Sequence, residues 1–272
     1  MDRLVRRPLS FMLDGAWIAA TLDEGSREIG LLIVTGGVQA RIGAHRGFAA
    51  LAAAVAGQGF PVFRFDRRGI GDSQGDDPGF DGSGPDISAA AQEFARQCPQ
   101  LRRIVGFGLC DAASALALFH EDAGIEALLL ANPWVVEPVS GLPPPAAIRR
   151  RYAERLTSRR GWSQLLRGSV DWRKAARGIV AAAAPAKDGL ARKVADVLTA
   201  SPAPVTIFLA SGDATAIAFE AEYRKPMFAR LRASGRARIE TLPTGSHSFA
   251  RPAERAWLAR TVIEALERLE AR

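Results

Sequence analysis

The chain has 272 residues with a formal net charge of +7 at pH 7, and 48% of the residues are hydrophobic against 24% charged. This length allows a sizeable core in one α/β domain with an insertion, and the composition is ordinary for a globular protein. Its two cysteines are too few for a disulfide framework, and they form no Cys-x-x-Cys metal pair. We therefore expect a reduced, cytoplasmic setting and neither a metal nor another cofactor.

The basic balance, with an isoelectric point near 10.2, has two interpretations. One is an anionic partner, and the other is an arginine-rich surface without a dedicated polyanion site. We favour the second, because the basic residues are spread along the chain and no nucleic-acid-binding motif appears. No apolar run approaches transmembrane length, and residues 1–8 lack the apolar core of a signal peptide. We expect no nucleic acid partner and no membrane span, and the oligomeric state stays open.

Apolar runs alternate along the chain with Ala- and Leu-rich helical patterns. The predicted strands are residues 10–20, 30–35, 61–66, 101–107, 125–131, 204–210 and 238–242. The predicted helices are residues 43–57, 86–97, 111–120, 219–233 and 251–270. This alternation predicts a mostly parallel central sheet with helices on both faces. Ligands bind such sheets at the carboxyl ends of the strands.

The composition changes after Trp134. Residues 138–145 are rich in Pro and Gly, and residues 146–200 show helical patterns with many arginines. We predict that residues 137–200 form a helical lid inserted between the two parts of the sheet domain, residues 1–136 and 201–272. The basic residues of the lid suit a solvated helix face, which we favour, or a rim that attracts an anionic substrate.

A short stretch between a predicted strand and a predicted helix has the spacing of a nucleophile elbow. It runs small–x–nucleophile–x–small, through Gly108, Cys110 and Ala112. A thiol at a helix N-terminus is favoured as thiolate by the helix dipole, whereas the neighbouring Asp111 opposes ionisation as a like charge. The alternative is a buried structural cysteine, as free cysteines often are. The residues that follow in the chain favour the elbow.

Nucleophilic catalysis also needs a base and a group that orients the base. Asp213 and His247 each follow a predicted strand, as Cys110 does, so all three side chains can converge on one edge of the sheet. Their order along the chain is nucleophile, acid, histidine. Asp213 alone would more often be a turn or capping residue, and a lone loop histidine is seldom catalytic. The three residues together, in this order and each after a strand, predict a Cys-His-Asp triad.

Acyl transfer further requires N–H donors for a developing oxyanion. We expect one donor from the backbone of Asp111 and the other from Gly37 or Val38. The latter two lie in a loop whose glycines permit close backbone approach, although an ordinary turn is the alternative there.

Three residues near these strand ends are candidates for contact with the substrate, namely Arg41, His45 and Trp134. His45 alternatively begins a helix. The remaining histidine, His120, ends the helix after the elbow, where a cation suits the helix dipole.

The motifs resemble those of a known superfamily. Gly36-Gly37, residues 65–73 (FDRRGIGDS), residues 108–113 (GLCDAA) and residues 245–247 (GSH) resemble the α/β-hydrolase superfamily. More narrowly, residues 35–46 and 108–114 resemble the exosortase A system-associated hydrolases, type 1. The resemblance covers nearly the whole sheet domain and is weakest in the lid. It implies an α/β-hydrolase fold and a setting of extracellular polysaccharide synthesis and exosortase-dependent sorting, but no particular substrate.

Cys in place of the usual Ser departs from the superfamily and resembles the dienelactone-hydrolase type. We therefore expect a hydrolase that cleaves an ester, lactone or thioester in a small-molecule acyl substrate through an acyl-cysteine intermediate. An acyltransferase to a sugar or amine acceptor would use the same intermediate, and water access would decide between the two. A non-catalytic binding protein on a hydrolase fold is the third alternative.

Overall fold

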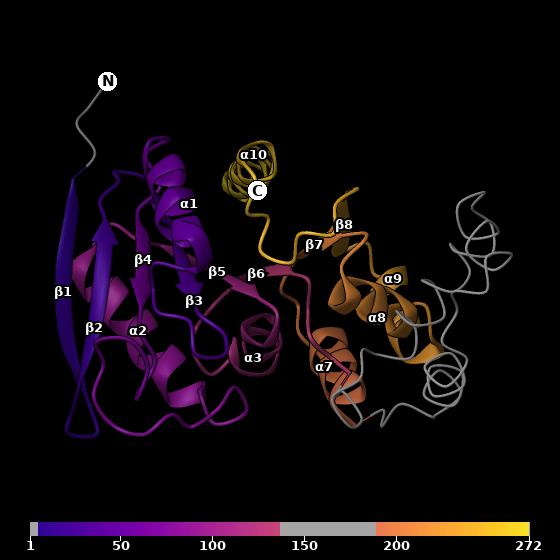
Figure 1. Ribbon diagram of the computed structural model, residues 1–272, viewed down its shortest axis with the longest axis horizontal. Coiled ribbons are helices and arrows are strands. Elements are labelled where there is room, and N and C mark those ends of the chain that lie inside the picture. The colour runs from indigo at the N-terminus through magenta and orange to yellow at the C-terminus, as the bar shows by residue number, and fades with distance from the viewer. Residues whose placement is uncertain (1–4, 137–188, 272) are drawn as a thin grey trace, which may run out of the picture.

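The structure is a computed structural model that describes residues 5–136 and 189–271. An eight-stranded sheet runs across it in the order β1-β2-β4-β3-β5-β6-β7-β8 (Figure 1). The strands are β1 (Arg6–Leu13), β2 (Ala16–Asp23), β3 (Ile29–Val34), β4 (Val62–Phe65), β5 (Arg103–Leu109), β6 (Ala127–Ala131), β7 (Val205–Ala210) and β8 (Ala237–Leu242). The described helices are α1 (Gly47–Ala56), α2 (Gly84–Gln97), α3 (Asp111–Phe119), α7 (Gly189–Ala200), α8 (Ala214–Tyr223), α9 (Ala229–Ala233) and α10 (Pro252–Glu270), with short 3-10 turns η1 (Ala44–Arg46) and η2 (Pro226–Phe228).

The strand pairing confirms the predicted mostly parallel sheet. β1 pairs antiparallel with β2, and β2 pairs antiparallel with β4. All pairs from β4 to β8 are parallel. The carboxyl ends of these parallel strands therefore meet at one edge, where the candidate site residues follow them.

Two predicted elements are wrong in a way that local chemistry explains. The strand predicted over residues 10–20 is a hairpin, because Asp14 (φ 49°) and Gly15 (φ 83°) form a tight turn with positive φ at both positions. The helix predicted over residues 219–233 is interrupted at Pro226, which lacks an N–H and begins η2.

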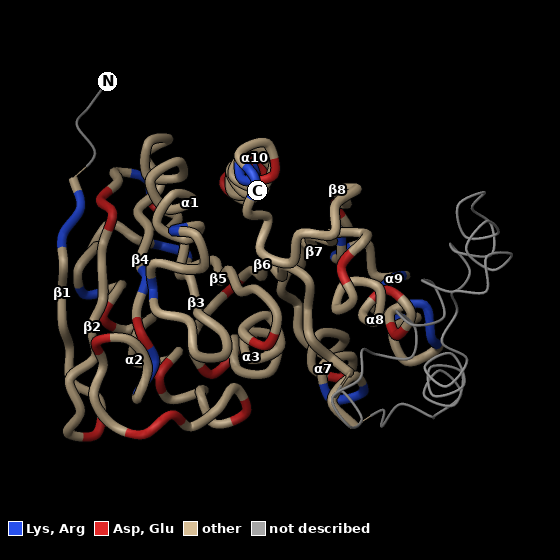
Figure 2. Tube along the Cα trace, in the orientation of Figure 1, with Lys and Arg blue, Asp and Glu red and all other residues tan. Residues whose placement is uncertain are grey.

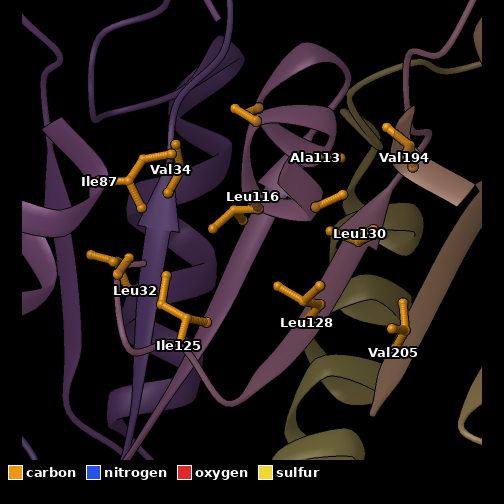
Figure 3. Close-up of a cluster of buried hydrophobic side chains, with 14 of the residues drawn as sticks. Leu32, Val34, Ile87, Ala113, Leu116, Ile125, Leu128, Leu130, Val194 and Val205 are labelled. Carbon is orange, nitrogen blue, oxygen red and sulfur yellow. The ribbon is translucent and has the colours of Figure 1, made fainter. Parts of the chain in front are cut away.

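The helices cover both faces of the sheet and bury a separate core on each. One core lies between the sheet and α2, α3, α7 and α8, and the other lies between the sheet and the pair α1 and α10 (Figure 1). In the first core, side chains of β3, β6 and β7 meet side chains of α2, α3 and α7, as Figure 3 shows for Leu32, Leu128 and Leu116. The alternation of side chains along each strand divides the apolar residues between the two cores.

The lid predicted over residues 137–200 lies outside the described residues except for its last twelve, which form α7. α7 packs against α3, and its Val194 and Leu198 belong to the first core. Lys and Arg are interspersed with Asp and Glu over the described trace (Figure 2). Within that part of the chain, no helix combines the length and the apolar character needed to cross a bilayer.

Candidate active site

Cys110 occupies a strained turn between β5 and α3. β5 ends two residues later than predicted and runs directly into this position. Cys110 has φ 62° and ψ −123°, a conformation that costs a non-glycine residue free energy and is found mainly at functional sites. Its N–H donates to the Ala131 carbonyl at the end of β6 (2.9 Å), and its own carbonyl accepts from the Trp134 N–H (3.1 Å). These two backbone hydrogen bonds hold the turn against the neighbouring strand.

The small residue before the cysteine has a steric reason. A Cβ at Gly108 would lie 2.7 Å from the backbone of Ala112, closer than real Cβ contacts allow. The first turn of α3 therefore folds directly over the end of β5. Cys110, at the turn between β5 and α3, is half-buried.

His247 lies between Cys110 and Asp213. Its Nδ1 is 3.1 Å from Oδ2 of Asp213, and the Cys110 side chain is close enough to affect the pKa of the ring. The hydrogen bond with Asp213, followed by the one with Cys110, raises the pKa of His247 to about 10. Both partners favour the protonated form of the ring.

Asp213 has two functions, because it also caps a helix. Its Oδ2 accepts from the N–H groups of Thr215 (3.0 Å) and Ala216 (3.1 Å) at the start of α8. Burial acts to raise the pKa of Asp213, but the hydrogen bond and charge of His247, together with these N–H groups, hold it below its usual value. The cap fixes the carboxylate in the position from which it orients the imidazole.

A buried asparagine that the sequence analysis did not propose also positions this loop. Asn132 Nδ2 donates to the backbone carbonyl of His247 (2.8 Å), and its Oδ1 accepts from the Ala210 N–H (2.8 Å). Asn132 has φ 41° and no exposed surface. Its amide therefore joins the ends of β6 and β7 to the loop that carries the histidine. The sequence carried one signal for Asn132, since it is a polar residue that directly follows a buried apolar strand.

The predicted oxyanion loop contacts the residue that follows the cysteine. The Gly37 N–H donates to Oδ2 of Asp111 (2.7 Å). A Cβ at Gly36 would lie 2.0 Å from Oδ1 of the same carboxylate, so any larger residue there would displace the Asp111 side chain. Because the carboxylate takes the Gly37 N–H, the donors left for an oxyanion are the N–H groups of Val38 and Asp111. Neither has a hydrogen-bond acceptor among the described residues.

Arg67 holds the same loop from the other side. Its guanidinium is 2% exposed, and Nη2 donates to the Gly37 carbonyl (2.6 Å) while Nη1 reaches Asp77 (3.3 Å). The Gly37–Val38 peptide is planar, so a fixed carbonyl also fixes the Val38 N–H on the opposite side. Arg67 was not among the residues predicted from the sequence, although an arginine two residues after a buried strand was a visible signal.

The three candidates for substrate contact have different surroundings. Arg41 donates through its backbone and its Nη1 to the buried Asp66, and Nη1 also reaches Asp72 (2.9 Å), so a substrate anion would compete with two carboxylates. His45 is exposed, and its carbonyl accepts from Nη1 of Arg255 (3.4 Å). Trp134 lies next to the elbow through its hydrogen bond to Cys110.

The other cysteine and the buried His120 lie outside this group. Burial raises the pKa of Cys98 to about 11, and His120 is enclosed between the carbonyl of Ala117 (3.1 Å) and Oγ of Ser201 (2.7 Å). Within the described residues, no cluster of three His, Cys, Asp or Glu side chains could hold a metal ion.

Comparison with known proteins shows the family of the chain. The model of the alpha/beta hydrolase family matches residues 31–261, which is most of the chain. The chain belongs to the α/β-hydrolase family. No curated protein sequence matches this hydrolase.

Solved structures with the same fold are distant in sequence. An esterase of Pyrococcus furiosus is 13% identical with a TM-score of 0.67, and the match covers 97% of this chain and 91% of that one. Est1E of Butyrivibrio proteoclasticus, solved with ferulic acid bound, is 18% identical with a TM-score of 0.63 over 97% and 100% of the two chains. A dienelactone hydrolase of Anabaena variabilis is 12% identical with a TM-score of 0.60 over 96% of each chain. At these identities the likeness shows the fold, and family and fold together support a hydrolytic enzyme for a small molecule.

Proposed function

We propose that the protein cleaves an ester, lactone or thioester through a Cys110–His247–Asp213 triad and an acyl-cysteine intermediate. One observation carries the proposal: Nδ1 of His247 lies 3.1 Å from Asp213, and the Cys110 side chain is the second partner that raises the pKa of the same imidazole. A nucleophile, a base and a group that orients the base are the three parts this chemistry needs.

The steps follow from the proton positions. The Cys110 thiolate attacks the acyl carbon, and the oxygen that becomes negative accepts from the N–H groups of Val38 and Asp111. The bond to the leaving group then breaks, and the leaving atom takes the proton from the imidazolium of His247. Water, deprotonated by His247, attacks the thioester, which releases the acid and restores the Cys110 thiolate and the imidazolium of His247.

A sugar hydroxyl or an amine that replaces water in the second step would make the protein an acyltransferase. The resemblance of residues 35–46 and 108–114 to the exosortase A system-associated hydrolases implies a setting of extracellular polysaccharide synthesis, in which a sugar is the alternative acceptor to water. A lid over residues 137–200 would control the access of water. Product analysis with and without sugar acceptors separates hydrolysis from transfer.

Mass spectrometry of the intact protein tests the proposal. After brief exposure to a p-nitrophenyl ester or an alkyl thioester and an acid quench, the protein should gain the mass of one acyl group, mapped to Cys110. Cys98 is the internal control, since its raised pKa of about 11 leaves it protonated and unreactive at pH 7. Cys110→Ala should gain no mass. An adduct that persists in Cys110→Ala, or full turnover by that variant, would contradict the triad.

A further inference from the structure

We propose that a cavity between α1 and α10 binds an apolar acyl chain of about six carbons while its carbonyl carbon reacts at Cys110. The assignment rests on the proposed function and extends it to a class of substrate. The cavity has a volume of about 180 Å³ and lies on the face of the sheet covered by α1 and α10.

Small residues create the space. Gly47, Ala50 and Ala54 lie on one face of α1, three or four residues apart, and Ala256 and Ala259 face them from α10. Their side chains are too short to fill the gap between the two helices. The larger lining side chains are mostly apolar: Phe48, Leu51, Phe107, Leu109, Phe249 and Leu258.

Three segments of the chain contribute to both the cavity and the candidate site. Leu109 lines the cavity and is bonded directly to Cys110, and Ser248 lines it and is bonded directly to His247. Gln39 extends the wall from the loop that carries Val38. The Cys110 side chain packs against the same apolar cluster whose members form the walls. Cys110 itself does not line the cavity, so a chain attached to the sulfur would enter it past Leu109 and Ser248.

The size of the cavity selects the ligand. An apolar cavity of about 150 Å³ takes up benzene, so by volume a cavity of about 180 Å³ holds a group of about six carbons. An acetyl group would leave most of it empty. At the edge of the cavity, the partly exposed Arg255 donates a hydrogen bond to the His45 carbonyl of η1.

Alkylation of Cys110 tests the cavity without any need for hydrolysis. We expect N-hexyl iodoacetamide to alkylate Cys110 about tenfold faster than N-methyl iodoacetamide, since a tenfold rate ratio needs only a small part of the transfer free energy of a hexyl chain. Benzene should slow the hexyl reagent and leave the methyl reagent unaffected. A ratio near one, or equal effects of benzene on both reagents, would overturn the assignment.

A cavity-filling variant with a matched control makes the test local. Gly47 has ordinary helical angles, and a Cβ added there meets no heavy atom within 4 Å. Gly47→Leu should therefore fold, keep the N-methyl rate and reduce the hexyl-to-methyl ratio to near one. Gly189 is also the first residue of a helix with open space at Cβ, so Gly189→Leu should leave the ratio unchanged. If Gly47→Leu fails to fold, Gly47→Ala together with the benzene competition on the native protein decides the question.

The outcomes separate this assignment from the proposed function. A hexyl preference that Gly47→Leu abolishes, in a protein that forms no acyl-cysteine with any ester, supports the cavity and refutes the hydrolysis. An acyl-cysteine that forms with no chain-length preference refutes the cavity and leaves the hydrolysis intact. With both correct, hexanoyl esters should exceed acetyl esters in kcat/KM, and only Gly47→Leu should remove the difference.

Discussion

The Gly37 N–H and the carboxylate of Asp111 form a 2.7 Å hydrogen bond across 74 positions of the chain. It joins the loop after β3 to the first residue of α3. The same carboxylate follows Cys110 directly, so one side chain both anchors the predicted oxyanion loop and adds a negative charge beside the nucleophile. The two effects can be separated by substitution.

Asp111→Asn should keep the anchor and remove the charge. The amide oxygen can still accept from Gly37, while loss of a like charge worth about 0.7–1 kcal/mol favours the Cys110 thiolate. We expect alkylation of Cys110 by iodoacetamide at pH 7 to accelerate roughly three- to fivefold. Asp122→Asn, at an exposed position just beyond α3, is the control and should change nothing. A slower reaction in Asp111→Asn would mean that the carboxylate promotes ionisation.

Cys110→Gly should be more stable than Cys110→Ala by about 1–2 kcal/mol, because only glycine adopts φ 62° without strain. The free energy of unfolding from urea titration measures the difference. The same Ala-to-Gly exchange within α3, at Ala113, should have the opposite sign and cost about 1 kcal/mol. Equal stabilities of the two Cys110 variants would show that the elbow is not strained.

Asn132→Asp should loosen His247 while the fold survives. The carboxylate keeps an acceptor for Ala210 but loses the donor to the His247 carbonyl, at a cost of about 1–3 kcal/mol. We expect Cys110 to need a higher pH for alkylation, because a displaced imidazolium stabilises the thiolate less. Ser114→Ala, which loses a hydrogen bond to the Trp134 carbonyl, is the control. Ser114→Ala should lower stability without shifting the pH dependence of Cys110 alkylation. If neither variant shifts that pH dependence, Asn132 does not position His247.

The pair of His247 and Asp213 should make stability depend on pH in two windows. The pKa of His247 is raised from 6.5 to about 10, so its contribution is complete below pH 6.5 and is lost as pH rises toward 10. The pKa of Asp213 is lowered from 3.8, so its contribution is complete above that pH and is lost as pH falls further. The stability difference between the native protein and His247→Gln should therefore peak between about pH 4 and 6.5. A difference that grows from pH 7 to 10 would contradict the pairing.

The sequence alone determined the layered α/β architecture, because burial on both faces of a parallel sheet requires continuous apolar runs that alternate with helices. It also determined that each candidate residue follows a strand. The elbow in particular could be recognised from the sequence, because small residues must flank its nucleophile. The hairpin at Asp14 and Gly15 was likewise present in the local turn chemistry.

Only the tertiary structure decided which groups meet across the strand ends. Side chains such as Arg67 and Asn132 act through backbone carbonyls that lie 30 and 115 positions away, and no local pattern specifies such partners. The packing of α1 on α10 likewise decided the cavity, because its volume depends on how closely the backbones of two helices approach across small side chains.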